Sequence, residues 1–518
     1  MTIRLVLSLL SACCLATPAQ AAAPLHAAAL QAAPTVAAAP SPPARERRFV
    51  TNHEAVVNGK KLSFTAEVEE HFLLDAQGRR GASVFTIAYR RTDTPKNIPR
   101  PVIFAFNGGP GAASLWLNMG YLGPKRIDVG DAEQPRQAPP FRLVENQDTP
   151  LDVADIVLID PPGTGFSRIL PDGKPESYYG TTADAQMTVD IINKWIREKN
   201  AWNTPKFLMG ESYGAIRAAL VARMLAGGPF STGHMDGVTL NGVILLGQGM
   251  VMGESPNVLA LTSLPSLAAT ACYHGRGPAG CTAQSQTRQA QDFILNGYGK
   301  ALWQGAALPA AERSAVATKL SALLGLPKAV IEEKALRIQA PDFARELLSD
   351  KHIQVGLYDA RFRYRGGPTG GDPIADDPAM GQYVPGFIAG ANMYLRDELK
   401  VTIDEPYHAI EFRSVNARWN WGSGPGVHRP VDASKDLAIA MRRNPALRLF
   451  IGTGYYDLVT TVGAAEHAVN QAGFPREATE LHEYESGHMP YLGDAPRKKL
   501  AADVRDFVKR ASQPSAKN

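Results

Sequence analysis

The sequence predicts an α/β protein built around a doubly wound, mostly parallel sheet. The first observation is a set of short, continuously apolar runs, which is typical of strands covered on both faces. These runs are PVIFAF (101–106), ADIVLID (154–160), KFLMG (206–210), LNGVILLG (240–247) and ALRLFIG (446–452). The second observation is that helical patterns lie between them, and strands that alternate with helices imply right-handed crossovers. With 518 residues, the chain also exceeds the size of a usual single core, so we expect a large insertion or a second domain.

The first residues indicate an export signal rather than a part of the fold. Arg4 precedes the apolar run LVLSLLSACCLA, and Ala19-x-Ala21 follows as a cleavage pattern. We therefore expect residues 1–21 to be a signal peptide cleaved near Ala21, and the mature protein to be secreted or periplasmic. No stretch is long enough to span a bilayer as a helix. The alternative is a lipoprotein, in which Cys13 becomes a lipidated N-terminus.

Residues 22–45 are rich in Ala and Pro and lack bulky periodic side chains, so we expect a disordered linker. Residues 46–254 are then predicted to form the first part of the α/β core. Between about Val50 and Tyr89, partial alternation and β-rich composition predict antiparallel strands. The pattern TTADAQMTVDIINKWIREKN at 181–200 predicts a helix between two of the apolar runs.

The segment 255–383 interrupts the alternation of strands and helices. We predict an inserted cap subdomain over the carboxyl edge of the sheet, where open α/β sheets bind ligands. The segment holds Cys272 and Cys281, which can form a disulfide in an oxidising compartment. We favour a structural disulfide over a metal site, because only His274 lies close by. The core is predicted to resume over 384–518 and to end in a helix.

Charge and composition exclude some classes of function. The net charge is +4 and no long basic run is present, so we expect no nucleic-acid binding. Hydrophobic content of 45% and charged content of 20% are ordinary for a globular protein. The sequence gives no sign of a cofactor, and we predict none.

The stretch FLMGESYGAIRAAL contains a candidate nucleophile, Ser212, between Gly210 and Gly214. An apolar run precedes the serine and a helical pattern follows it, which is the strand–turn–helix context of a nucleophile elbow. Glycine removes the Cβ clash in such a sharp turn, and a helix N-terminus brings backbone N–H groups beside the serine. On this stretch alone, a small structural turn residue is the alternative.

A serine nucleophile needs a base, and the base needs an orienting acid. Asp457 lies just beyond a predicted strand in ALRLFIGTGYYDLVT, and His488 lies in a glycine-flanked loop after the strand-like stretch ATELHEY. The chain order Ser, acid, His is that of α/β-hydrolases. A zinc site at His482 and Glu483 is not favoured, because the H-E-x-x-H pattern is not satisfied.

The glycine-rich stretch FNGGPGAASLW, residues 106–116, is a candidate oxyanion loop. It follows a predicted strand, as the lipase-type oxyanion loop does, and acyl transfer requires such preorganised donors. A phosphate cradle is not supported, because the third glycine of G-x-G-x-x-G is missing and no G-K-[ST] follows.

Five motifs together resemble the serine carboxypeptidases, a family of the α/β-hydrolase superfamily. NGGPGAAS, DPPGTGFS, GESYGA, GTGYYDLVT and SGHMPY occur in the family's order and together span about Pro101 to Arg497. The chain resembles a divergent, bacterial-type secreted member. The resemblance implies an α/β-hydrolase fold with N-terminal antiparallel strands and an inserted cap. It also implies an enzyme that removes C-terminal residues from peptides with a free C-terminus, through an acyl-enzyme.

The resemblance assigns roles to particular residues. Ser212, Asp457 and His488 would form the catalytic triad. Backbone N–H groups of Gly109 and Tyr213 would form the oxyanion hole. The residues expected to recognise the substrate's α-carboxylate are Asn107, Gly108 and Glu211.

The sequence departs from the family pattern near this predicted carboxylate site. Phe106 replaces a tryptophan, and Ala112 removes a disulfide cysteine. Tyr121 stands where the family has a glutamate that shares a proton with the counterpart of Glu211. Two close carboxyl groups cannot both ionise, so an acidic pair keeps one proton at the site. With Tyr121, Glu211 would be anionic and repel a C-terminus, or Tyr121 would donate its hydroxyl to the substrate.

Other functions therefore stay open at the level of sequence. An esterase, an acyltransferase or a prolyl-type aminopeptidase on the same fold is the second hypothesis, because the cap rather than the triad sets substrate choice. A non-catalytic exported binding protein is the third. For Trp419 and Trp421, ordinary packing is favoured over a role in lining the substrate cleft.

Overall fold

The computed structural model describes residues 45–95, 98–227, 237–427 and 430–513. The predicted signal peptide, the cysteine of the lipoprotein alternative and nearly all of the predicted linker lie outside these residues. Among the residues described, no helix combines the length and the apolar character needed to cross a membrane.

The fold is organised around a ten-stranded, mostly parallel sheet, as the sequence predicts. The strands lie in the order β1-β2-β3-β7-β4-β9-β10-β15-β16, and β8 (Arg168–Ile169) pairs with β3 outside this path. The N-terminal part is an antiparallel meander of β1 (Arg48–Val57), β2 (Lys60–Leu74) and β3 (Arg80–Arg91). β3 then pairs antiparallel with β7, which joins the meander to the parallel strands.

Five of the six strands of the parallel part are the continuously apolar runs of the sequence, and the sixth, β16, is the strand-like stretch before His488. The six strands are β4 (Val102–Phe106), β7 (Asp155–Asp160), β9 (Lys206–Glu211), β10 (Gly242–Leu246), β15 (Arg448–Gly454) and β16 (Thr479–Tyr484). Every residue of β4, β9 and β10 is buried, because helices cover both faces of the sheet. Since parallel strands end at one edge, the loops that follow them meet there.

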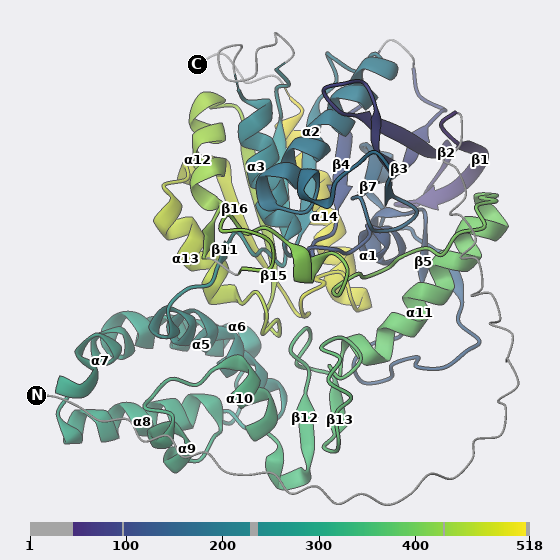
Figure 1. Ribbon diagram of the computed structural model, residues 1–518. Coiled ribbons are helices and arrows are strands. Elements are labelled where there is room, and N and C mark those ends of the chain that lie inside the picture. Colours follow the sequence, from purple (N-terminus) through teal and green to yellow (C-terminus); the bar gives the residue numbers. More distant parts are fainter. Residues whose placement is uncertain (1–44, 96–97, 228–236, 428–429, 514–518) are drawn as a thin grey trace, which may run out of the picture. The chain divides into compact units, whose positions relative to one another are not determined.

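Two hydrophobic cores fill the space on the two faces of the sheet, and alternate residues of each strand point into one or the other. One core packs against helices α2 (Thr181–Glu198), α3 (Gly214–Leu225), α12 (Ser434–Arg443) and α13 (Val462–Ala472). The other packs against α14 (Asp494–Ala511) and α11 (Met380–Met393). Figure 1 shows α2, α3 and α12 on one side of the strands.

The inserted segment is largely helical and has a hydrophobic core of its own, in which Leu267, Leu320 and Phe343 are buried. Its helices are α5 (Pro256–Tyr273), α6 (Ala283–Phe293), α7 (Gly299–Gln304), α8 (Ala310–Leu324), α9 (Lys328–Glu333) and α10 (Ala340–Glu346). Cys272 and Cys281 are joined by a disulfide that fixes the turn between α5 and α6. These helices gather apart from the sheet in Figure 1.

Helix α11 crosses the boundary expected at Tyr383, so the excursion from the sheet does not end there. Its residues are mostly apolar and pack onto the core of the sheet, with Tyr383 and Phe387 buried. The remaining elements are short: α1 (Leu115–Leu117), β5 (Lys125–Ile127), β6 (Leu143–Glu145), β11 (Val251–Met252), β12 (Ile353–Val355), β13 (Arg363–Arg365) and β14 (Val431–Asp432).

Candidate active site

Ser212 lies in the sharp turn between strand β9 and helix α3, with a positive φ of 61°. Non-glycine residues avoid this conformation unless the surroundings enforce it, and such strain clusters at functional sites. The flanking glycines allow the turn. A Cβ atom on Gly210 would lie 2.1 Å from the carbonyl oxygen of Gly214, and one on Gly214 would lie 2.9 Å from that of Phe106. The backbone N–H of Ser212 donates to the carbonyl of Leu246 at 3.0 Å, which ties the turn to strand β10.

His488 and Asp457 meet in the loops that follow β16 and β15. The imidazole Nδ1 lies 2.8 Å from Asp457 Oδ2, and both side chains are buried. Asp457 also accepts hydrogen bonds from the backbone N–H groups of Val459 and Thr460 and from the Thr460 hydroxyl. These donors hold the carboxylate in place. With a proton at Nδ1 for Asp457, the ring keeps Nε2 as an acceptor, which is what a general base requires.

The surroundings of His488 favour its charged form. Burial acts to lower the pKa of the imidazole, but the Asp457 carboxylate, the hydrogen bond to it and the more distant Glu211 act to raise it. The net result is a pKa above the ordinary value of histidine. An imidazolium formed during a reaction would therefore be stabilised by Asp457.

One cavity of about 60 Å³ is lined by residues from both the first and the second part of the core. Both Ser212 and His488 line it. It is also lined by the sequence-predicted residues Asn107, Gly108, Gly109 and Glu211. From the inserted segment, Tyr358 contributes its ring, which stands edge-on to His488 with 5.3 Å between the ring centroids. The cavity therefore joins a candidate nucleophile and base to candidate substrate-binding groups.

The glycine-rich loop after β4 packs directly against the turn that carries Ser212. A Cβ atom on Gly108 would lie 2.5 Å from the backbone nitrogen of Tyr213, so only glycine permits this approach. Gly109 follows with a φ of 102°. The backbone N–H groups of Gly109 and Tyr213 thus belong to two segments in direct contact, as an oxyanion hole requires.

A buried ion pair that the sequence did not point to holds this loop in place. Arg217 on α3 donates to the carbonyl of Asn107 at 2.6 Å and to the Asp184 carboxylate of α2 at 2.7 Å. Both charged side chains are 1% exposed. The available signal was an arginine and an aspartate within otherwise apolar helical faces, where charge is rare unless it is paired.

Glu211 is the second buried acid of the cavity. Its Oε1 accepts a hydrogen bond of 2.7 Å from the side-chain amide of Asn107. Its Oε2 is buried and has no hydrogen-bond partner among the residues that the structure describes. Burial raises the pKa of the carboxyl to about 7, although the charge of His488 opposes this rise. Near neutral pH the group therefore exists in both its protonated and its charged forms.

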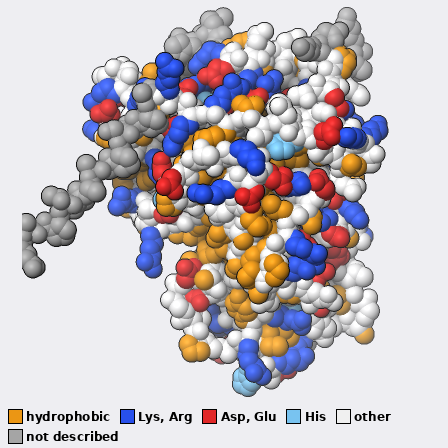
Figure 2. Space-filling model, turned by 90° about the vertical axis from the view of Figure 1, so that its right-hand side faces the viewer, with side chains coloured by type: hydrophobic (Ala, Val, Ile, Leu, Met, Phe, Trp, Pro, Cys, Tyr) orange, Lys and Arg blue, Asp and Glu red, His pale blue; other side chains and the backbone are white. Residues whose placement is uncertain are grey.

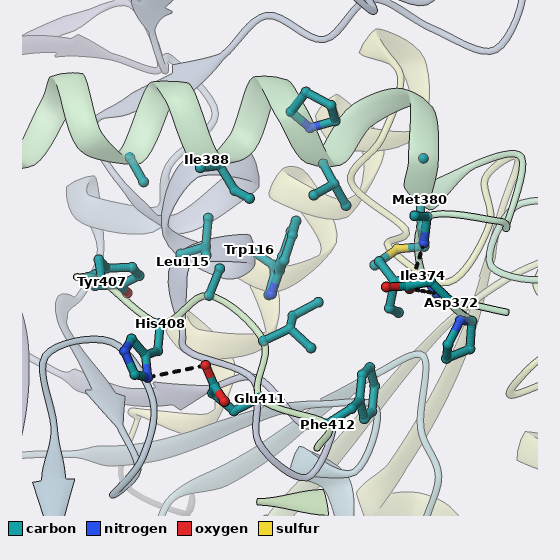
Figure 3. Close-up of a pocket in the computed structure, with 18 of the residues that line it drawn as sticks. Leu115, Trp116, Asp372, Ile374, Met380, Ile388, Tyr407, His408, Glu411 and Phe412 are labelled. Carbon is teal, nitrogen blue, oxygen red and sulfur yellow. Dashed lines mark hydrogen bonds and ion pairs between the residues drawn. The ribbon is translucent and has the colours of Figure 1, made fainter. Parts of the chain in front are cut away.

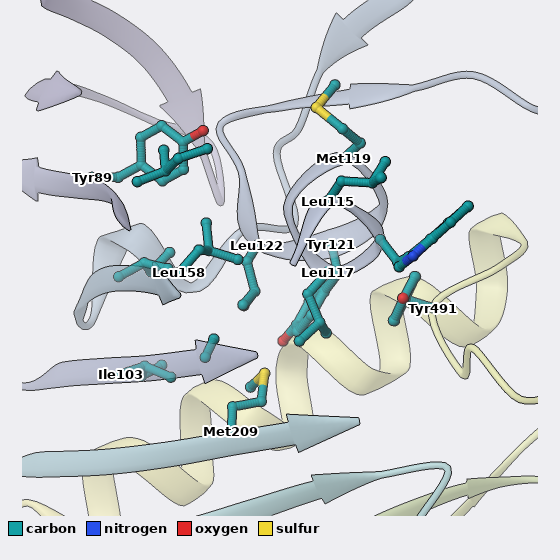
Figure 4. Close-up of a cluster of buried hydrophobic side chains, with 14 of the residues drawn as sticks. Tyr89, Ile103, Leu115, Leu117, Met119, Tyr121, Leu122, Leu158, Met209 and Tyr491 are labelled. Carbon is teal, nitrogen blue, oxygen red and sulfur yellow. The ribbon is translucent and has the colours of Figure 1, made fainter. Parts of the chain in front are cut away.

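The structure does not bring Tyr121 to Glu211. Tyr121 is fully buried in the turn before β5, and its ring stacks on that of Tyr491 with 6.0 Å between centroids (Figure 4). Besides burial, the charges of Arg505 and Asp148 affect the pKa of its hydroxyl most, and Arg505 lies on α14. Tyr121 does not line the cavity that Ser212 and His488 share. Its hydroxyl is thus in no position to replace the family's acid.

The residue that does face Glu211 is Tyr491. Its hydroxyl and Glu211 Oε2 are both buried and lack a well-aligned hydrogen bond, yet each influences the other. The hydroxyl acts to lower the pKa of Glu211, and the carboxylate raises the pKa of Tyr491. Sequence reasoning missed this residue, although it lies only three positions after His488 in the motif SGHMPY.

The tryptophans at 419 and 421 serve packing. Both lie edge-on to the ring of Tyr213, with 5.3 and 5.7 Å between ring centroids, and Trp419 also stacks on Tyr179. Neither lines the catalytic cavity. They support the residue that follows the nucleophile.

No cluster of three or more His, Cys, Asp or Glu side chains suited to a metal ion occurs in the part of the chain that the structure describes. His482, from the discarded zinc pattern, instead contacts Glu480 at 3.1 Å and stacks on Phe450.

Comparisons with known proteins confirm the predicted resemblance and the fold. Residues 67–260 match the family model described as serine carboxypeptidase. The solved structure of Kex1Δp, a prohormone-processing carboxypeptidase from Saccharomyces cerevisiae, matches with a TM-score of 0.54 and 15% identity, over 86% of this chain and 91% of that one. No curated protein matches the chain in sequence.

Two further solved structures match with lower scores. A putative aryl esterase from Burkholderia cenocepacia has a TM-score of 0.36 and 14% identity, over 85% of this chain and 98% of that one. A proline iminopeptidase from Mycobacterium smegmatis has a TM-score of 0.34 and 15% identity, over 86% and 98%.

Proposed function

We propose that this hydrolase of the serine carboxypeptidase kind is an exported enzyme that removes residues from peptide C-termini through a Ser–His–Asp triad and an acyl-enzyme. The observation that carries the proposal is the small cavity shared by Ser212, His488 and Glu211, with Asp457 bonded to the imidazole at 2.8 Å. The match of residues 67–260 to the family model supports the same class of reaction.

In this mechanism Ser212 attacks the scissile carbonyl while His488 takes the serine proton at Nε2. Asp457 keeps the other ring nitrogen protonated and stabilises the imidazolium. The backbone N–H groups of Gly109 and Tyr213 receive the developing oxyanion. His488 then gives its proton to the leaving amine, and water hydrolyses the acyl-enzyme with the same histidine as base.

Recognition of the free C-terminus would fall to Asn107 and Glu211. A protonated Glu211 can donate a hydrogen bond to the substrate carboxylate, whereas a charged one repels it. Because burial raises the pKa of Glu211 to about 7, we expect binding of free acids to weaken as the pH rises through neutrality. His488, in contrast, must be neutral to act as a base, so its deprotonation favours the reaction as the pH rises.

A serine-reactive phosphonate tests the catalytic assignment. The wild-type protein should form one covalent adduct on Ser212, detected by mass spectrometry, and Ser212→Ala should form none. His488→Ala should slow labelling by orders of magnitude, because the serine then lacks its base. If the Ser212→Ala protein were still labelled at the wild-type rate, Ser212 would not be the nucleophile.

A second candidate function is favoured by one observation. Within the described part of the chain, no acidic side chain shares a hydrogen bond with Glu211, since Tyr121 lies elsewhere and Tyr491 offers only a hydroxyl. An esterase, an acyltransferase or a prolyl-type aminopeptidase does not require a free C-terminal carboxylate. Such an enzyme would label with the phosphonate and yet turn over a peptide acid and its amide equally well.

Export is proposed on the N-terminal pattern and is supported by the disulfide between Cys272 and Cys281, because such bonds persist in oxidising compartments. N-terminal sequencing of the mature protein should give Ala22 as the first residue. A lipid-modified Cys13 would instead establish the lipoprotein alternative.

A further inference from the structure

A large apolar cavity adjoins the catalytic cavity and has no role in the reaction described above. Its volume is about 640 Å³, ten times that of the catalytic cavity and within the range of pockets that bind small ligands. The two cavities lie side by side, because five residues line both: Trp116, Ile374, Met380, Ile410 and Phe412. A substrate longer than one residue that is bound at Ser212 can therefore extend to the large cavity.

Helix α11 forms one long wall of this cavity. Met380, Val384, Ile388 and Ala391 line it at helical spacing, so the helix presents one face to it over three turns (Figure 3). From Met380, which also lines the catalytic cavity, to Asn392 at the far end, the helix rises about 18 Å. An extended peptide of about five residues covers the same distance. The cavity is thus much longer than the side chain of one amino acid.

The opposite wall comes from the strand-like segment that crosses the oxyanion loop. Ala112 pairs with Ile410, and the N–H of Glu411 donates to the carbonyl of Gly111 at 2.8 Å. This wall is therefore fixed to the same loop that carries the predicted oxyanion donor Gly109. A group held against it therefore lies next to the loop that carries Gly109.

The lining of the large cavity is mostly apolar, and it also includes the charged side chains of Asp372, Glu411 and Arg413. Leu115, Trp116 and Ile388 supply apolar surface to the interior, and Ile388 remains 41% exposed. His408 Nδ1 lies 3.2 Å from the carboxylate of Glu411 (Figure 3), and burial lowers the pKa of the imidazole. Hydrophobic side chains also gather in the middle of the face that Figure 2 presents, on the side where α11 lies. A peptide segment with several apolar side chains fits a lining of this kind.

We infer that the cavity along α11 is a binding site for several apolar residues of a peptide substrate, those that precede the cleaved bond. The inference rests on the proposed function, because a carboxypeptidase releases one residue and all further substrate residues precede the bond. The site makes the enzyme selective for peptides with an apolar C-terminal region. Burial of two or three apolar side chains contributes enough free energy to favour such substrates by at least about tenfold.

Binding to the Ser212→Ala protein tests this inference without any hydrolysis. Calorimetry compares acetyl-Leu-Phe-Leu-Phe-Ala-Lys with acetyl-Ser-Gly-Ser-Gly-Ala-Lys, which share their last two residues. We expect the apolar peptide to bind at least about tenfold more tightly, and Ile388→Asp in the same background to remove most of that difference. Leu295→Asp is the matched control, because Leu295 is 83% exposed on the insertion and does not line the cavity. Thermal unfolding checks that both variants fold.

Equal affinity for the two peptides would overturn the inference, and so would an Ile388→Asp protein that keeps the full difference. Tight binding of decanoate in place of the apolar peptide would assign the cavity to an acyl chain and would also contradict it. Hydrolysis by the wild-type protein is measured separately. If the apolar peptide binds but is never cleaved, the proposed carboxypeptidase activity fails while the peptide site stands.

Discussion

At the scale of single residues, the site differs most from its expected pattern at the position beside Glu211. The sequence has a tyrosine, Tyr121, where an acid was expected, but its ring stacks on that of Tyr491 and its hydroxyl lies near charges that include Arg505 of α14. A different tyrosine, Tyr491, lies beside the carboxyl group of Glu211. A phenol ionises far less readily than a carboxylic acid, so it places a neutral hydroxyl beside Glu211 at any physiological pH.

The substitution Tyr491→Phe tests this arrangement. The hydroxyl acts to lower the pKa of Glu211, so its removal should raise that pKa further above about 7. Protonated Glu211 would then persist to higher pH, and the rise in KM for free-acid peptides should shift to higher pH. The measurement is KM against pH for one peptide acid.

The matched control is Tyr121→Phe, which removes a hydroxyl of the same kind that does not reach Glu211. Its KM profile should follow that of the wild type. A shift in the Tyr121→Phe profile with none in Tyr491→Phe would reverse the two roles.

At the scale of elements, three segments distant in sequence are held together by one buried charge pair. Helix α2 supplies Asp184, helix α3 supplies Arg217, and the loop after β4 offers the carbonyl of Asn107. The guanidinium also lies over the rings of Phe106 and Tyr213, 5.2 and 5.4 Å from their centroids. Arg217 therefore holds the loop that is predicted to form the oxyanion hole.

Removal of one member of the Arg217–Asp184 pair should lower the free energy of unfolding. Arg217→Met leaves Asp184 buried and unpaired, which we expect to lower the free energy of unfolding by about 3–5 kcal/mol. The double variant Asp184→Leu/Arg217→Met should recover most of this loss, because no unpaired charge remains. Urea unfolding measures both effects.

Activity separates positioning from mere stability. In the double variant the Asn107 carbonyl still lacks its donor, so kcat should stay about 10²-fold below the wild type even after stability returns. Full recovery of kcat in the double variant would mean that the pair serves only the core.

These elements also show what the sequence could reveal. Strands such as β4, β9 and β10 were predictable because helices cover both faces of the sheet. Their residues are therefore all buried, and their sequences are continuously apolar. The candidate nucleophile was predictable because a strained turn needs glycines at fixed offsets. The positions of Tyr121 and Tyr491 were not, because the direction of a side chain depends on how its turn packs against α14 and the histidine loop. The role of Arg217 depends in the same way on the packing of two helices.

At the scale of the whole molecule, an inserted helical segment lies between strands of one sheet and supplies walls to the site. Its helices α5 to α10 have their own apolar core, and Tyr358 reaches from this segment to His488. The predicted end of the insertion at Tyr383 falls within α11. The glycine- and proline-rich stretch at 366–373 ends before α11 begins, and Pro385 lies inside the helix. The helix packs on the core of the sheet along its length.

The disulfide between Cys272 and Cys281 should stabilise the insertion locally. The two residues are nine apart, and closing a loop of this size contributes about 2–3 kcal/mol in the chain-entropy account. The variant Cys272→Ser/Cys281→Ser should therefore lose about that much stability in thermal unfolding. Phosphonate labelling of Ser212 should persist, because neither cysteine lines the catalytic cavity. Loss of labelling in a folded variant would show that the turn between α5 and α6 reaches the active site.

The central claim is that the cavity around Ser212 acts on peptides with a free C-terminal carboxylate. The most direct measurement compares kcat/KM for a blocked peptide acid and for its C-terminal amide, below the pKa of Glu211. We predict a preference of at least about 10²-fold for the acid, since only the acid offers a charged partner to Asn107 and protonated Glu211. Equal turnover of acid and amide would contradict the account and leave a serine hydrolase of a different specificity.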